Sequence, residues 1–121
     1  MKFLLFCCME ERKLEALSKI EVEALMDETS AYCEALRKNG RLILSEPLEP
    51  VQMAATVRVR NGSLSTTDGP FAETKEQIGG FFLINARDLN EAIQVASRFP
   101  SVRLGSMEVR PVRELNGLQR S

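Results

Sequence analysis

The fold is decided by the stretch Lys2-Phe3-Leu4-Leu5-Phe6-Cys7-Cys8-Met9 near the N-terminus. Because successive side chains of a β-strand point to opposite faces of a sheet, the odd-numbered residues here face one way and the even-numbered residues the other. Both sets are apolar, whereas a strand with one solvated face would alternate apolar with polar residues. The stretch therefore predicts a strand whose two faces must both be covered.

Two capped helices follow this strand. A capping box at Ser18 and Glu21, in which each side chain satisfies a free backbone amide of the other residue, begins the first helix. An apolar stripe at helical spacing continues from there to Asn39-Gly40, which is typical of a left-handed stop. A second cap at Asp88 begins a helix that Pro100 closes. The sequence therefore predicts one helix of about five turns and a shorter one near the C-terminus.

Extended segments alternate with these helices. Asn61-Gly62 joins two of them and is typical of a type I′ hairpin, since both central residues of that turn need positive φ. Pro47 and Pro50 end an earlier segment because proline removes amide donors. We expect strands over residues 2–9, 41–46, 55–60, 63–67, 80–86 and 105–112, and a turn or short helix over 10–17.

These elements follow in the order βαββαβ once the hairpin is treated as an insertion. The order predicts an α+β, ferredoxin-like fold in which both helices pack on one face of the sheet. The other face would then be exposed in a monomer, although residues 2–9 and 80–86 are apolar on both sides. Such a surface usually marks an interface, so we expect a homodimer with sheet packed against sheet. We expect one domain over residues 1–114 and a flexible tail over 115–121.

Composition excludes several kinds of chemistry. The 121 residues include 16 Lys plus Arg against 17 Asp plus Glu, so the net charge of −1 gives no basic field for a nucleic-acid backbone. The absence of histidine removes the commonest general base and the usual haem and zinc ligands. No stretch is long enough to cross a bilayer. We therefore expect a cytoplasmic protein without a metal, a cofactor, nucleic acid or a membrane as partner.

The cysteines Cys7, Cys8 and Cys33 are odd in number and two are adjacent, which does not predict a disulfide framework. We expect reduced, buried thiols. The alternative is a redox or metal role for Cys7-Cys8, but this pair lacks the C-x-x-C spacing and has no histidine to join it.

One longer segment, Asp68-Gly69-Pro70-Phe71-Ala72-Glu73-Thr74-Lys75-Glu76-Gln77-Ile78-Gly79-Gly80, resembles the DGPF proteins of the YCII-related group. The resemblance extends through residues 81–84 and 105–112, includes 46–48 and 56–60, and covers most of the domain. It implies a dimeric α+β barrel, in agreement with the element order, and most members have no assigned reaction. Some relatives are encoded beside or fused to extracytoplasmic-function sigma factors, which implies a sigma factor as partner in bacterial transcription control. The wider group is associated with a His-Asp pair, which this chain cannot form.

This motif has a structural and a functional interpretation. Structurally, Asp68-Gly69-Pro70 would form a tight turn that carries Phe71 back toward the core, ahead of Gly79-Gly80. Functionally, a cleft near the open face of the sheet would bind a small polar ligand or transfer protons. The side chains expected around that cleft are Asp68, Glu73, Lys75 and Glu76. The last three also fit a solvated first helical turn capped by Thr74, so spacing alone leaves both interpretations open.

Polar residues on two strands leave similar alternatives. Arg58 and Arg60 project to one face of their strand and would form an anion-binding site if that face lines the barrel. On an outer edge they would instead be charges that prevent edge-to-edge pairing. Ser106, Glu108 and Arg110 share a strand face that points either into a cavity or to solvent.

Two functions follow from these candidates. We favour a homodimeric module that binds a small polar ligand or a partner protein, because it needs no catalytic base. The alternative is a cofactor-free enzyme that uses carboxylate acid/base chemistry, with Asp68 or Glu73 as base and Lys75 or an arginine as electrostatic stabiliser. Enclosure of these groups in a pocket would favour the enzyme, and an open surface would favour the module.

Overall fold

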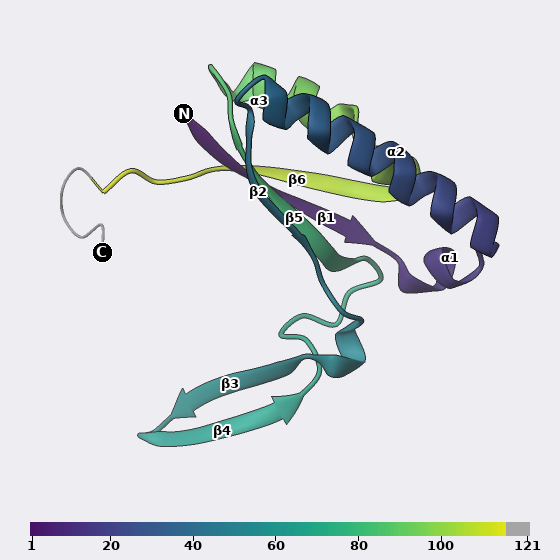
Figure 1. Cartoon of the computed structure of the whole chain (residues 1–121). Helices are drawn as coiled ribbons and strands as arrows, with labels where there is room; N and C mark the ends of the chain where they lie inside the picture. Colours follow the sequence, from purple (N-terminus) through teal and green to yellow (C-terminus); the bar gives the residue numbers. More distant parts are fainter. Residues whose placement is uncertain (116–121) are drawn as a thin grey trace.

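The computed structural model describes residues 1–115, which form a four-stranded antiparallel sheet and a separate two-stranded one (Figure 1). The larger sheet has the order β2-β5-β1-β6, from β1 (Lys2–Met9), β2 (Leu42–Pro47), β5 (Gln77–Asn85) and β6 (Gly105–Pro111). The helices are α1 (Glu11–Glu15), α2 (Lys19–Lys38) and α3 (Leu89–Ser97), with 3₁₀ turns η1 (Val51–Met53) and η2 (Pro100–Arg103). The smaller sheet pairs β3 (Ala55–Arg60) with β4 (Ser63–Asp68). The predicted βαββαβ order with an inserted hairpin is confirmed.

The helices α2 and α3 cover one face of the four-stranded sheet, and the core lies between these layers (Figure 1). Phe99 stacks on Phe82 of β5 with ring centroids 4.1 Å apart and meets Tyr32 of α2 edge-on at 4.7 Å. The Tyr32 hydroxyl donates a hydrogen bond of 2.7 Å to the Val95 carbonyl, so it links α2 to α3. This hydrogen bond satisfies the polar end of Tyr32, while its ring packs against the core.

Both ends of α2 follow the sequence signals. The Glu21 amide donates to the Ser18 hydroxyl at 3.1 Å, and the Ser18 amide donates to the Glu21 carboxylate at 2.9 Å, which is the predicted capping box. At the other end, the amides of Gly40 and Arg41 donate to the carbonyls of Arg37 and Leu36, the Schellman pattern that satisfies otherwise free carbonyls. These local bonds set the length of the helix that covers the sheet.

The strand β5 begins three residues earlier than expected. Its register against β1 shifts between Cys7 and Cys8, which pair with Gly80 and Ile78, so a bulge lets the strand continue through the two glycines. At Gly80 a side chain would approach the Glu46 carbonyl oxygen of β2 to 3.1 Å. Glycine here allows β2 and β5 to stay paired where a larger residue would crowd them.

The other face of the sheet is not covered by α2 or α3, and its side chains form rows across the four strands. One row runs Glu46, Phe81, Phe6, Glu108 and places two half-buried aromatic rings between two exposed carboxylates. We call these four residues the aromatic row. The neighbouring row is Leu44, Leu83, Leu4 and Arg110. The apolar residues of β1 therefore face both sides of the sheet, as the sequence predicted. In one chain, helices pack on only one of these sides.

The hairpin β3–β4 extends away from the body of the molecule, beside the uncovered face (Figure 1). Asn61 has φ 53° and Gly62 has φ 77°, as the predicted type I′ turn requires. Of the predicted tail over 115–121, residues 116–121 lie outside the described part of the chain.

Candidate functional site

The segment after β4 is an irregular loop that is held at the base of the hairpin. The Gly69 amide donates to the Ala54 carbonyl at 2.8 Å, and the Thr56 hydroxyl donates to the Gly69 carbonyl at 2.9 Å. Gly69 has φ 101°, a left-handed conformation that favours glycine. These bonds direct the chain toward the uncovered face of the sheet, and residues 73–76 do not form the helical turn considered above.

Phe71 does not return to the core, so that structural expectation is wrong for the single chain. Its side chain is 78% exposed because Gly69 is bound at the hairpin base, on the side of the sheet opposite the helices. The Arg58 guanidinium lies over the Phe71 ring at 5.6 Å from the centroid, within the range of a cation–π contact. Phe71 is thereby placed between the hairpin and the sheet.

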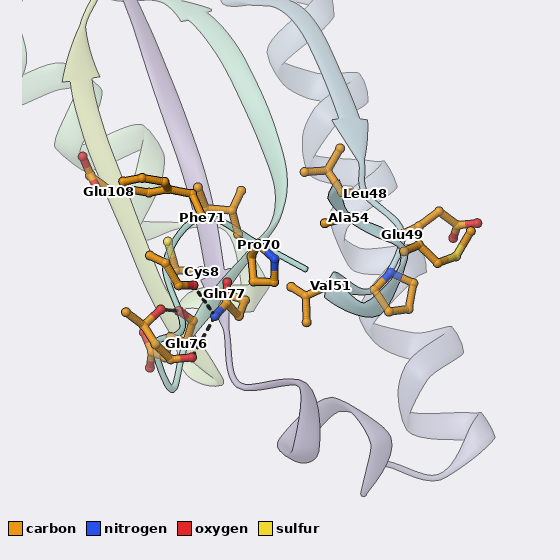
Figure 2. Close-up of a pocket in the computed structure, with 15 residues that line it drawn as sticks. Cys8, Leu48, Glu49, Val51, Ala54, Pro70, Phe71, Glu76, Gln77 and Glu108 are labelled. Atoms are coloured by element: carbon orange, nitrogen blue, oxygen red, sulfur yellow. Dashed lines mark hydrogen bonds between the residues drawn. The ribbon is translucent and has the colours of Figure 1, made fainter. Parts of the chain in front are cut away.

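A cavity of about 580 Å³ lies between this loop, the β2–β3 connection and the uncovered end of the sheet (Figure 2). We call it the Phe71 cavity. Its apolar walls come from Leu48, Pro50, Val51, Met53, Ala54, Pro70, Phe71, Ala72 and Ile78, and its polar groups from Cys8, Glu49, Thr74, Glu76, Gln77 and Glu108. A volume of this size suits a small organic molecule, whose ring the apolar walls would cover.

The polar side of the cavity is fixed by hydrogen bonds. The Gln77 side-chain amide donates to the carbonyls of Ala72 and Thr74 at 2.9 Å each, which folds the loop back on itself (Figure 2). The Ser106 hydroxyl of β6 donates to the Glu76 carboxylate at 2.7 Å. Glu76 is thus positioned against the edge strand, on the same side as Glu108.

Cys8, Glu49 and Gln77 are polar residues of the cavity that the sequence did not identify as ligand-binding. Burial raises the pKa of the Cys8 thiol, and the charges of Cys7, Glu108 and Glu76 raise it further. A raised pKa favours the protonated thiol over the thiolate nucleophile, and the Cys8 thiol donates a weak hydrogen bond of 3.8 Å to the Phe6 carbonyl. The alternation of residues 2–9 already assigns Cys8 to the uncovered face, and this signal could have identified it. Cys7 and Cys33 are buried, and all three thiols are free.

The predicted site residues are divided between the cavity and the outer surface. Glu76 lines the Phe71 cavity, whereas Asp68, Glu73 and Lys75 are exposed and are not among its lining residues. Lys75 instead borders a shallower depression beside α1 with Glu10, Glu11 and Arg12. The four charged residues of the motif are thus not gathered around one cleft in the single chain.

The strand candidates are also divided. Arg58 is half-buried beside Phe71, with its guanidinium 3.4 Å from the Thr67 hydroxyl, whereas Arg60 is exposed and donates to the Val59 carbonyl. Glu108 lines the cavity, and the Ser106 hydroxyl hydrogen-bonds the lining residue Glu76. Arg110 is exposed, and its guanidinium lies 3.7 Å from the Glu108 carboxylate.

A second cavity of about 370 Å³ lies between α2 and the packed face of the sheet. Its walls are mainly apolar, from Met9, Leu25, Met26 and Phe82, and its polar lining residues include Thr29, Ser30, Ser45 and Ser101. The Thr29 hydroxyl at its border donates to the Leu25 carbonyl within α2.

Among residues 1–115, no group of three or more Cys, Asp or Glu side chains is placed to hold a metal ion. In the same part of the chain, no helix is both long and apolar enough to span a bilayer. The Phe71 cavity combines apolar walls with the carboxylates of Glu49, Glu76 and Glu108.

Comparisons with known proteins agree with this architecture. A family model described as YCII-related domain matches residues 1–116. An uncharacterized protein of Rhizobium meliloti (strain 1021), R00369, is 39% identical over 114 residues, which are 93% of this chain and 92% of that protein.

One solved structure with a similar fold is 5-chloro-2-hydroxyhydroquinone dehydrochlorinase (TftG) from Burkholderia phenoliruptrix AC1100, in complex with 2,5-dihydroxybenzoquinone. The similarity has a TM-score of 0.55 at 15% identity and covers 96% of this chain and 97% of that one. At this identity the similarity concerns the fold.

Proposed function

This chain belongs to the YCII-related family, and from that premise we propose that it is a homodimer that binds a small molecule in the Phe71 cavity. The observation that carries the proposal is the cavity itself, where an apolar wall faces the carboxylates of Glu76 and Glu108. Ionised carboxylates only accept hydrogen bonds, so they favour a ligand that donates them. The ligand class is a small, flat apolar molecule with hydroxyl or ammonium groups along one edge.

The homodimeric part of the proposal is supported by the uncovered face of the sheet. Phe6 and Phe81 remain half-buried in one chain, and a second subunit would complete their burial. The sheet-against-sheet packing expected from the sequence would also enclose the open side of the Phe71 cavity, where a ligand would otherwise face solvent.

The alternative is catalysis in the same cavity. Asp68, Glu73 and Lys75 were the sequence candidates, but the carboxylates that line the cavity are Glu76, Glu108 and Glu49. Glu76 is oriented by Ser106, as a general base would need to be. The name of the structural neighbour, a dehydrochlorinase of a hydroxyhydroquinone, favours testing hydroxylated benzenes as substrates as well as ligands.

A sigma factor as partner stays a prediction of the family resemblance. The binding module needs such a partner only if ligand occupancy is to be transmitted to transcription. Copurification of this chain with sigma factors would test that prediction separately from ligand binding.

Calorimetric titration with hydroquinone, catechol and tyramine tests the ligand class, with benzoate as the contrasting anion. We expect saturable binding of at least one donor ligand and weaker binding of benzoate, which the carboxylates would repel. Glu108→Gln should weaken the binding by at least about tenfold, because hydrogen bonds to charged groups contribute about 1.5–3 kcal/mol. Glu73→Gln, on the loop that borders the cavity but not among its lining residues, is the matched control and should leave the binding unchanged.

The same samples separate binding from catalysis. Unchanged ligand after incubation supports the binding module, and release of a product in a Glu76-dependent reaction supports the enzyme. If none of the donor ligands binds, or if Glu73→Gln weakens binding as much as Glu108→Gln does, the proposed ligand class is wrong.

A further inference from the structure

Another cavity, of about 380 Å³, lies between α2 and α3 on the side of the sheet that these helices cover (Figure 1). Its lining residues recur at helical spacing, at 32, 35, 36 and 39 along α2 and at 91, 94, 95 and 98 along α3, so each helix contributes one face. Its polar groups come from Tyr32, Asn39, Arg41, Glu91, Gln94 and Arg98. We call it the Arg98 pocket. A dimer formed sheet against sheet would leave it open to solvent.

The Arg98 pocket is rich in hydrogen-bond donors. Arg41 and Arg98 line it, and each guanidinium group carries five N–H donors and no acceptor. Asn39 and Gln94 are exposed at its border, where each can turn a side-chain N–H₂ group inward. Such a set of donors suits a ligand that accepts several hydrogen bonds at once.

The carboxylate of Glu91, which also lines the pocket, is already compensated. It accepts the Arg87 amide at 2.9 Å, and the guanidinium groups of Arg87 and Arg41 lie 3.4 Å and 3.6 Å away. Arg87 is in addition 3.8 Å from the Asp88 carboxylate. In the described part of the chain, none of the ion pairs includes Arg98, which is exposed. The charge of Arg98 is therefore available to an anion.

The wall between the two helices is fixed by Tyr32, whose hydroxyl donates to the Val95 carbonyl at 2.7 Å. Burial raises the pKa of this hydroxyl, whereas the charges of Arg98 and Arg41 act in the opposite direction, so both arginines are near it. The last carbonyls of α2, which would repel an anion, accept the amides of Gly40 and Arg41. The pocket is therefore electropositive although a helix ends beside it.

We propose that the Arg98 pocket binds the phosphate group of a small phosphorylated polyol. Arg41 and Arg98 hold the phosphate, because guanidinium groups match its geometry and stay charged. A phosphate offers three acceptor oxygens and nearly two negative charges, which use more of these donors than a carboxylate does. The remaining acceptor sites of Glu91 receive a hydroxyl of the polyol. This site is on the opposite side of the sheet from the Phe71 cavity and does not depend on the function proposed for that cavity.

The only tyrosine of the chain provides a specific reporter, because Tyr32 lines the pocket and the sequence has no tryptophan. Titration of the whole protein with glycerol 3-phosphate at constant ionic strength should give a saturable change in tyrosine fluorescence. Glycerol should give none because it lacks the anion. Inorganic phosphate should bind more weakly because it lacks the polyol, and malonate should bind more weakly because it carries carboxylates in place of phosphate.

Substitutions at the arginines test which groups hold the phosphate. Arg98→Gln and Arg41→Gln should each raise the dissociation constant for glycerol 3-phosphate by at least about tenfold, because charge-assisted hydrogen bonds are the strong ones. Arg98→Lys should recover part of the affinity, since lysine restores the charge but not the paired donors. Arg60→Gln is the matched control, because it removes the same charge from an exposed position on the hairpin and should leave the dissociation constant unchanged.

Calorimetric titration of the same samples detects binding that does not alter the fluorescence. Absence of saturable binding of glycerol 3-phosphate by both methods would overturn the proposal, and so would an effect of Arg60→Gln as large as that of Arg98→Gln. Malonate binding as tight as that of glycerol 3-phosphate would overturn the preference for phosphate. Glu108→Gln in the Phe71 cavity should leave this titration unchanged, so the two sites succeed or fail separately.

Discussion

Gly105, the first residue of β6, gives the sharpest structural prediction for this chain, through Gly105→Ala. Gly105 pairs with Met9 at the end of the β1–β6 ladder, beside Cys8 of the cavity. A methyl group on Gly105 would overlap the Cys8 carbonyl oxygen and would stand 3.1 Å from the Met9 Cα. Since β1 is hydrogen-bonded on both sides, it cannot move away easily, and the end of β6 must shift instead.

The expected cost follows from these contacts. Overpacking of this kind destabilises proteins by about 1–3 kcal/mol, and a hydrogen bond lost at the end of the ladder adds about 1 kcal/mol. The smaller conformational entropy of alanine in the unfolded chain offsets about 0.4–1 kcal/mol. We therefore expect a loss of about 2 kcal/mol, which for a chain of this size lowers the melting temperature by about 8 °C.

The control is Gly79→Ala in β5, because a methyl group at Gly79 would meet no atom within 4 Å. Its free energy of unfolding should be equal to that of the wild type or slightly higher. Urea denaturation followed by circular dichroism measures both variants under the same conditions. If Gly105→Ala and Gly79→Ala agree within about 0.5 kcal/mol, the close approach of β6 to β1 is not what requires glycine.

Three further predictions follow from the core and the cavity. Phe99→Ala should lower the free energy of unfolding by about 3–5 kcal/mol because it removes the ring at the centre of the aromatic core, whereas Ile20→Ala on the surface should cost under about 1 kcal/mol in the same denaturation assay. Glu108→Gln should lower the pKa of Cys8, because one of the charges that disfavour its thiolate is removed; alkylation rates measured against pH should shift to lower pH, and no shift would place Glu108 out of reach of the thiol. The control Glu73→Gln should leave that profile unchanged. The free energy of unfolding should fall as the pH rises above 9.0, the ordinary thiol pKa, because burial raises the pKa of all three thiols and the folded chain keeps protons that the unfolded chain releases. Denaturation at about pH 8 and about pH 10 measures this, and greater stability at the higher pH would contradict it.

The sequence predicted most of the elements because their signals are local. The box at Ser18 and Glu21 and the turn at Asn61-Gly62 depend on atoms only a few residues apart, and both form as expected. The start of β5 was misplaced because Gly79-Gly80 is typical of a strand boundary. Only the neighbouring strands, through the bulge opposite β1, show why the strand continues.

The candidate site was predicted less well because its residues come from distant parts of the chain. Glu76 was identified within its motif, but its partner Ser106 is 30 residues away and its orientation depends on the register of β6. Phe71 was expected in the core because a tight turn at Asp68-Gly69-Pro70 would carry it back there. The direction of the loop, fixed by Gly69 at the hairpin base, brings it to the opposite side of the sheet.

By itself, the sequence determined that β1 lies inside the sheet and needs cover on both faces, since its alternation has no polar side. It also determined the family, the capped helices and the exclusion of histidine chemistry. The tertiary structure decided which polar groups share a site. Cys8, Glu76 and Glu108 line one cavity because of the strand register and the direction of the loop. Periodicity specifies the face on which a residue lies, but only the folded chain brings residues on one face together from its two ends.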